Sequence, residues 1–152
     1  MKKVIKFSIV LAMIIATTSL VGCKDDNGGG GGGSTAKLSP PAWIQGAWGY
    51  EDVELAIKIE AFKFTSNDVL VMGVSLKDIW NANVPGVAKY SLKETKNTSS
   101  LYEITISASA GGESASGCYS FRKGDGTYID AASNETGTPL TDDDYEKFDK
   151  LN

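Results

Sequence analysis

The sequence predicts a small all-β domain built around an antiparallel sheet. From Trp43 onward, apolar residues recur at every second position more often than at the helical spacing of three or four. Turn-forming residues interrupt this alternation at intervals of roughly 10 residues. Such a pattern is typical of an antiparallel sandwich or barrel, and the pattern alone leaves both open. The 152 residues are enough for one domain of this kind.

The strands can be followed along the chain from their alternation. Residues 55–60 alternate apolar with polar or small side chains, whereas Phe62 and Phe64 continue on the opposite parity. A β-bulge is therefore expected near Ala61. Further strands are predicted over residues 69–72, 90–93, 102–107 and 119–121, and a last strand begins at 128 after a tight glycine turn at 124–126.

Two segments carry helix signals instead. Residues 75–80 begin with a serine–aspartate capping box, which predicts one or two helical turns. Residues 141–151 begin with a threonine–aspartate capping box and place Tyr145, Phe148 and Leu151 at helical spacing. Three aspartates at the start of this segment would favour the positive end of a helix dipole. We therefore expect a short C-terminal helix that packs on the outside of the sheet.

Residues 1–22 resemble a bacterial lipoprotein signal peptide. Three lysines precede an apolar run of about 10 residues, which is too short to span a bilayer permanently. The tetrapeptide Leu-Val-Gly-Cys at residues 20–23 resembles a lipobox. The resemblance implies cleavage before Cys23 and acylation at that residue with palmitate-type chains, which anchor stably when two or three are present. Cys118 would then be the one remaining cysteine, so no internal disulfide is expected, and Cys118 is interpreted as a small buried apolar residue.

Residues 23–37 are expected to form a flexible, lipidated tether. No apolar residue interrupts positions 24–35, and six consecutive glycines occupy 28–33. The run Cys-Lys-Asp-Asp followed by glycines is similar to the export signal of surface-exposed lipoproteins in Bacteroidetes-type bacteria. That resemblance implies a lipid anchor in the outer membrane, with the body facing the cell exterior. A polar spacer without any address value is the alternative. The folded domain is expected to cover 38–152.

Composition excludes several classes of function. The chain has no histidine, which removes Ser-His-Asp catalysis and His-ligated metal sites. The net charge is −4, and removal of residues 1–22 leaves 12 cationic against 19 acidic residues, a net charge of −7. A nucleic-acid partner would require a basic surface. No spacing brings two carboxylates together for acid–base work, and no phosphate-binding motif is present. We therefore expect no enzyme activity, no cofactor and no metal.

The start of the first strand carries a family resemblance. Gly46, Ala47 and Trp48 form a Gly-x-Trp sequence that resembles the opening motif of lipocalins, and residues 119–128 resemble the late hairpin of small lipocalin-like lipoproteins of Bacteroidetes. The resemblance implies an up-and-down antiparallel barrel of about eight strands with an interior cavity. It also implies that Gly46 and Trp48 form the barrel base and that Arg122 covers the Trp48 indole. A solvated Arg122 on an outer strand face is the alternative. The domain is short for a full lipocalin.

Two functions follow as expectations. In the first, the barrel binds a small apolar or amphipathic ligand; the candidate residues are a lid of Leu76, Ile79 and Trp80, with Trp43, Tyr50 and Tyr90 lining the pocket. Each of these aromatic residues could instead be ordinary core. In the second, the chain is an interaction protein at the cell surface, either an inhibitor or an accessory subunit. A filled interior favours the second function and an open cavity favours the first.

Overall fold

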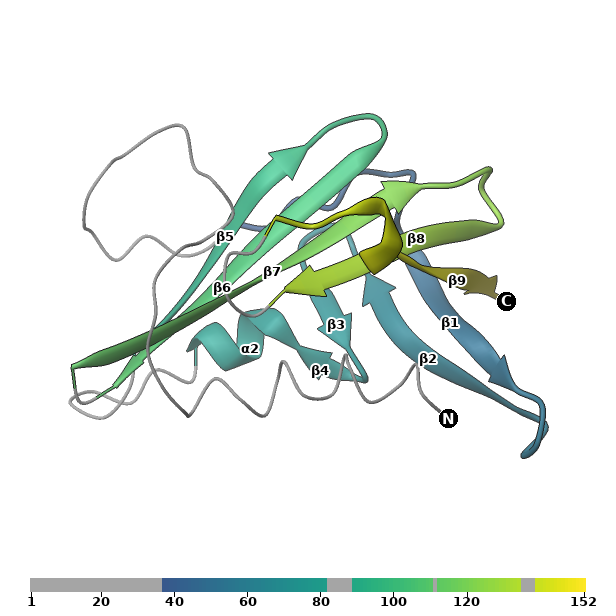
Figure 1. The fold of residues 1–152 in the computed structure, drawn as a ribbon, viewed down its shortest axis with the longest axis horizontal. Helices are drawn as coiled ribbons and strands as arrows, with labels where there is room; N and C mark the ends of the chain where they lie inside the picture. The colour runs from purple at the N-terminus through teal and green to yellow at the C-terminus, as the bar shows by residue number, and fades with distance from the viewer. Residues whose placement is uncertain (1–36, 82–88, 111, 135–138) are drawn as a thin grey trace.

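The computed structural model describes residues 37–81, 89–110, 112–134 and 139–152, without the side chains of Trp80 and Asn81. Within these residues the chain forms nine strands in one antiparallel sheet, one short α-helix and one 3-10 turn (Figure 1). The strands are β1 (Gly46–Asp52), β2 (Ile57–Phe64), β3 (Val69–Val71), β4 (Val74–Ser75), β5 (Lys89–Asn97), β6 (Leu101–Ala110), β7 (Glu113–Lys123), β8 (Tyr128–Asn134) and β9 (Glu146–Leu151). Helix α2 (Leu76–Asn81) follows β4, and the 3-10 turn η2 (Asp142–Asp144) precedes β9. The predicted all-β, antiparallel class is confirmed.

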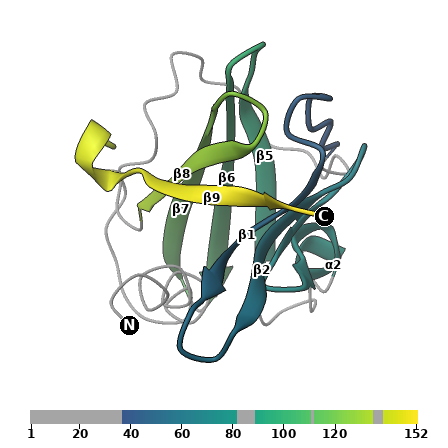
Figure 2. The same cartoon turned by 90° about the vertical axis from the view of Figure 1, so that its right-hand side faces the viewer.

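The sheet follows an up-and-down order with one interruption. Its strand order is β4-β3-β2-β1-β9-β8-β7-β6-β5, so neighbours in the chain pair everywhere except between β4 and β5. The last strand, β9, pairs with the first, β1. The sheet curls around its inner face as a half-barrel (Figure 2). The expected closed barrel of about eight strands is therefore wrong in two respects, because nine strands are present in the described residues and the sheet stays open.

The odd number of strands explains the opening. When all hydrogen-bonded neighbours are antiparallel, the strand order makes β4 and β5 run in the same direction. A ring of antiparallel neighbours closes only with an even number of strands. Two parallel strands also cannot be joined by a tight turn and need a crossover connection. Helix α2 lies in this connection and contacts β3, β4 and β5. It thus covers the place where the sheet does not close.

The predicted bulge near Ala61 is confirmed. Trp48 pairs with Phe62 and Gly49 pairs with Glu60, which leaves Ala61 as the extra residue of β2. The bulge brings the two backbones close together, and a Cβ atom at Gly49 would overlap the carbonyl oxygen of Ile59. A glycine is required at this position for that reason.

Helix α2 begins where the capping box predicts it. The hydroxyl of Ser75 accepts a hydrogen bond from the Asp78 amide at 3.0 Å. Asp68, in the turn before β3, adds a second cap that the sequence pattern did not reveal. Its carboxylate accepts hydrogen bonds from the Ser75 hydroxyl at 2.6 Å and from the amides of Val69 and Lys77 at 2.8 and 3.2 Å. Six residues are too few for a stable isolated helix, so α2 depends on these caps and on packing.

The expected C-terminal helix is wrong. The predicted capping interaction does form, since the Asp144 carboxylate accepts hydrogen bonds from the Thr141 amide and hydroxyl at 2.8 and 2.9 Å. It supports only the 3-10 turn η2, after which residues 146–151 extend as β9. Strand β9 fills the place between β1 and β8 and pairs with both. Two rows of backbone hydrogen bonds outweigh the weak propensity of a three-turn helix.

The N-terminal part of the described chain packs across one end of the sheet. Leu38 and Ile44 are buried, at 3% and 0% exposure. Ser39 is held against β5, because its amide donates to the Glu94 carboxylate at 2.9 Å and its carbonyl accepts from Asn97 at 2.9 Å. Burial alone would raise the pKa of Glu94, but the hydrogen bonds from Asn97 and Ser39 outweigh it and the pKa is lowered. An ionised carboxylate therefore fastens this segment.

Candidate functional site

The side chains on the inner face of the sheet differ in size along the β6–β7 hairpin. Their cross-strand pairs run in the order Tyr102–Phe121, Ile104–Tyr119, Ile106–Gly117 and Ala108–Ala115. The inner face is thus lined by large rings near the β5–β6 turn and by small side chains towards the β6–β7 turn.

The aromatic half is densely packed. Phe121 lies 5.1 Å from Phe62 and 4.9 Å from Phe64 between ring centroids, and Phe62 lies 5.0 Å from Phe148. All three pairs meet nearly edge to face, which is a favourable geometry for aromatic rings. These rings come from β2, β7 and β9 and are at most 4% exposed. Side chains of the protein itself therefore occupy this half of the inner face.

The predicted lid residues belong to the core. Leu76 is 2% exposed, and Ile79 packs against the buried cluster as a partly buried residue. Both lie on α2, which covers the sheet opening between β4 and β5. The predicted lid role of Trp80 lies outside the described part of the structure, because the Trp80 side chain is not described. Leu76 and Ile79 thus pack into the hydrophobic core from the side where the sheet is open.

The predicted pocket-lining residues lie at opposite ends of the sheet. Trp43 precedes β1, and its indole N–H donates to the Thr98 carbonyl in the β5–β6 turn at 3.0 Å. Tyr50 is near the other end of β1, edge-on to Phe148 at 6.4 Å. Tyr90 is near the start of β5, at the same end of the sheet as Tyr50. The strands β9, β8, β7 and β6 lie between Tyr50 on β1 and Tyr90 on β5, and Trp43 lies at the other end of the strands, so the structure does not bring the three residues together.

Tyr50 has one property that suits ligand contact. Its hydroxyl is buried and has no hydrogen-bond partner within the described part of the chain. Burial raises the pKa of the Tyr50 phenol, and the nearby Asp52 carboxylate raises it further. A buried hydroxyl without a partner is destabilising unless a further group reaches it.

Trp48 lies in the core, but Arg122 does not cover it. Trp48 is fully buried and donates its indole N–H to the Ile44 carbonyl at 2.6 Å. Gly46, two residues earlier, has a φ of +125°, a conformation that favours glycine where the chain enters β1. The cation nearest the Trp48 ring is Lys150, with its Nζ 5.5 Å from the ring. The expected stack of Arg122 on Trp48 is not found.

Arg122 lies on the outer face of β7 instead, next to the inward-facing Phe121. Its guanidinium lies 3.6 Å from the centroid of the Tyr145 ring and donates to the Asp142 carboxylate at 2.7 Å. That hydrogen bond raises the pKa of Arg122, so its charge is fixed. The position alternates with Phe121, so strand parity could have placed Arg122 outside. Parity could not have identified Tyr145 as its partner, because that residue was expected in a helix.

A polar cluster that the sequence analysis missed lies beside Arg122 on the outer face. The Glu103 carboxylate accepts a hydrogen bond from the Ser120 hydroxyl at 3.1 Å and pairs with the Lys96 ammonium at 3.2 Å. The hydroxyls of Ser120 and Tyr145 are 2.7 Å apart. Glu103 and Ser120 are paired across β6 and β7, and this register is the signal that links them. Ser120 is fully buried, so a substrate could not reach its hydroxyl, and the cluster fastens the segment before β9 to the sheet.

Cys118 is buried as expected, at 1% exposure, but it is not a thiol. The structure has it in a disulfide. The expectation of no internal disulfide is thereby corrected. The chain contains one other cysteine, Cys23, which lies outside the described residues. A sulfur can carry either a thioether to lipid or a disulfide, so the two modifications of Cys23 would exclude each other in one molecule.

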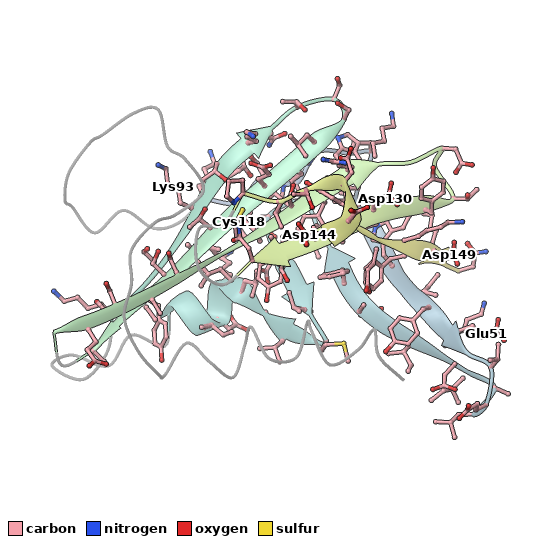
Figure 3. The ribbon with its side chains drawn as sticks, viewed as in Figure 1. Glu51, Lys93, Cys118, Asp130, Asp144 and Asp149 are labelled. Carbon is pink, nitrogen blue, oxygen red and sulfur yellow. The ribbon has the colours of Figure 1, made fainter. Side chains whose placement is uncertain are left out.

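No group of three or more His, Cys, Asp or Glu side chains among the described residues is arranged to hold a metal ion. In the same ranges, no helix has the length and apolar character needed to span a membrane. The labelled carboxylates are dispersed: Glu51 lies by the β1–β2 hairpin, whereas Asp130, Asp144 and Asp149 lie around β8 and β9 (Figure 3).

Comparison with known proteins adds no relative. No protein-family model, no curated protein and no solved structure matches the chain.

Proposed function

We propose that the protein is a lipid-anchored interaction protein of the outer membrane, with its half-barrel domain facing the cell exterior. The anchor rests on the lipobox-like residues 20–23, and the exterior location rests on the tether that follows them. In the anchored protein the Cys23 sulfur carries lipid, so Cys118 is a thiol there and the disulfide belongs to the chain before lipidation. The observation that carries the interaction function is the packed inner face. Phe62, Phe64 and Phe121 fill the half of the inner face next to Trp48, at centroid distances of 4.9–6.3 Å, so this half has no room for a ligand.

The anchor is tested with two cysteine variants. Metabolic labelling with a palmitate analogue should label the wild type and Cys118→Ser, and should leave Cys23→Ser unlabelled because the acceptor sulfur is gone. Mass spectrometry of the non-reduced mature protein reports the state of Cys118 in parallel. Label that persists in Cys23→Ser, or a disulfide between Cys23 and Cys118 in the mature membrane fraction, would contradict the anchor.

The packed interior is tested with a cavity variant. Lipids, sterols, tetrapyrroles and glycans should leave the melting temperature of the wild type unchanged, since a ligand stabilises only a site it can occupy. Phe121→Ala should open a space of ring size and gain a shift with benzene, as apolar cavities of that size do. A shift of the wild type with any ligand of the panel would contradict the packed interior.

Ligand binding is the second candidate, and a specific observation favours it. The Tyr50 hydroxyl is buried beside the Phe148 ring and has no hydrogen-bond partner among the described residues. A small amphipathic molecule with one polar group could reach that hydroxyl. The same ligand panel decides between the two candidates: Tyr50→Phe should weaken a shift that depends on the hydroxyl, and it should raise the unliganded stability because the removed hydroxyl has no partner among the described residues.

A further inference from the structure

The large apolar side chains that the described structure leaves exposed are gathered in two turns. Val53, Leu55 and Ile57, at 84%, 65% and 47% exposure, lie in or next to the β1–β2 turn. Met72 and Val74, at 42% and 41%, lie in or next to the β3–β4 turn. The two turns are not at one place: the Met72 amide donates to the Ala61 carbonyl at 2.8 Å, so the β3–β4 turn lies beside the middle of β2, and Figure 1 shows it apart from the β1–β2 turn. We call Val53, Leu55 and Ile57, which share the β1–β2 turn, the apolar rim.

Folding of the domain does not account for the apolar rim. The β1–β2 turn is held by polar contacts, because the Asp52 carboxylate accepts hydrogen bonds from the amides of Glu54 and Leu55 at 3.0 and 3.1 Å. Ala56, in the same turn, has a φ of +51°, a conformation for which glycine or asparagine is the usual choice. Polar or small residues would therefore serve this turn equally well. Exposed apolar side chains gathered in one place mark an interaction surface more often than scattered ones do.

The charges around the rim indicate what covers it. Residues 51–58 contain Glu51, Asp52 and Glu54 against Lys58, a net charge of −2. Glu51 and Glu54 are exposed, and Glu51 stands at the hairpin in Figure 3. A bilayer would require these carboxylates to enter the headgroup region next to the apolar side chains, without the basic and aromatic residues that favour that position. A second copy of the chain, if it met this rim with its own rim, would bring like charges together.

We propose that the apolar rim docks onto a protein partner that offers an apolar depression bordered by lysine or arginine side chains. The proposal rests on the proposed function and names the surface through which it acts. Aliphatic side chains at the centre and charges at the border match the usual division of a protein interface into an apolar core and a polar margin. Opposite charges at that border would select the partner and accelerate its encounter with the rim.

The test uses photocrosslinking in the cells that produce the full chain. Leu55 is replaced by p-benzoylphenylalanine, and Ser99, exposed in the β5–β6 turn at the opposite end of the sheet, is the matched control position. We expect one discrete protein adduct from position 55 and none from position 99. The crosslinked peptide of the partner should contain lysine or arginine beside apolar residues.

A charge-reversal variant adds the second readout. Glu51→Lys combined with Glu54→Lys should lower the adduct yield by roughly fivefold or more, because border attractions become repulsions. The melting temperature of the purified full-length variant should fall only slightly, since both side chains are exposed and the one new like-charge neighbour across the hairpin is Lys58, opposite position 51. The proposal would be overturned by an adduct to lipid, by an adduct to a second copy of the chain, or by equal adducts at positions 55 and 99. It would also be overturned if the charge reversal left the adduct yield unchanged.

Palmitate-analogue labelling of the same cells separates this proposal from the proposed function. Labelled protein without a position-55 adduct overturns the docking surface alone. An adduct from unlabelled protein overturns the membrane anchor and keeps the docking surface. Absence of both overturns both.

Discussion

Trp48 combines complete burial with a satisfied polar atom. Its ring is 0% exposed, and its indole N–H reaches the Ile44 carbonyl, which belongs to the segment that crosses the end of the sheet. The side chain thereby joins the first strand to that segment. An indole in such a position contributes both apolar burial and a buried hydrogen bond, and neither is replaced when the ring is removed.

Trp48→Ala should therefore be among the most destabilising single substitutions, at about 3–5 kcal/mol. Denaturant unfolding of the wild type and the variant measures the difference. Trp43→Ala is the matched control, because Trp43 is only partly buried, and it should cost distinctly less. A loss below about 1 kcal/mol for Trp48→Ala would contradict its place in the core.

Tyr102 gives the domain a dependence on alkaline pH. Burial raises the pKa of its phenol far above the ordinary value of 10.0 for tyrosine, and the Glu94 charge raises it further. The unfolded chain loses this proton near pH 10, whereas the folded chain retains it. The free energy of unfolding should therefore be unaffected by this group below pH 10 and should fall as the pH rises above 10. Unfolding measured from pH 8 to 11 should show this fall, and Tyr102→Phe should reduce its slope.

At the scale of single elements, helix α2 shows how one side chain can set a boundary. Asp68 accepts hydrogen bonds from Val69, Ser75 and Lys77 and so ties the turn before β3 to the first turn of the helix. Loss of such a cap typically costs about 0.5–2 kcal/mol.

Asp68→Ala should lower the free energy of unfolding by about 1–2 kcal/mol. Asp143→Ala, which removes a carboxylate that is exposed in η2, should change it by less than about 0.5 kcal/mol. Thermal or denaturant unfolding measures both variants. Equal effects of the two substitutions would show that net charge, rather than the cap, is responsible.

Strand β9 is the element whose identity depends most on its surroundings. Phe148 is 4% exposed and faces the aromatic cluster, whereas Lys147 and Asp149 are exposed. The strand pairs with β1 on one side and with β8 on the other. It therefore connects the two halves of the sheet, β1 to β4 and β5 to β8.

Removal of residues 146–152 should prevent folding of the domain, because β1 and β8 would both become unpaired edges and Phe148 would be lost. Circular dichroism and amide NMR dispersion of the truncated chain measure this, with removal of Asn152 alone as the control. A truncated chain with wild-type spectra would contradict the central place of β9.

At the scale of the whole molecule, the sheet is stabilised unevenly. Seven of the nine strands in the described residues have hydrogen-bonded neighbours on both sides, whereas β4 and β5 end the strand order. Native-state hydrogen exchange should be slowest for the amides of the inner strands, above all of β6 and β7, which share the longest ladder. Exchange from β4 and from α2 should proceed through local opening at a lower free energy. Uniform protection across all nine strands would indicate a sheet closed between β4 and β5.

The sequence by itself determined those features that depend on neighbours along the chain. Alternating side chains indicated the antiparallel strands, the change of parity before Phe62 located the bulge at Ala61, and Ser75 with Asp78 located the start of α2. The burial of Cys118 followed from its apolar neighbours. In each case the signal and the structure that it predicts lie within a few residues of each other.

Only the tertiary structure decided which distant residues meet. Residues 146–151 carry a helical spacing, but two vacant strand edges make them a strand. Because residues 146–151 form a strand instead of a helix, Tyr145 lies on the outer face, where Arg122 stacks on it instead of on Trp48. The opening between β4 and β5 depends on the number of strands in the whole sheet. Backbone hydrogen bonds across the sheet outweigh local propensity, and their partners lie far apart in the sequence.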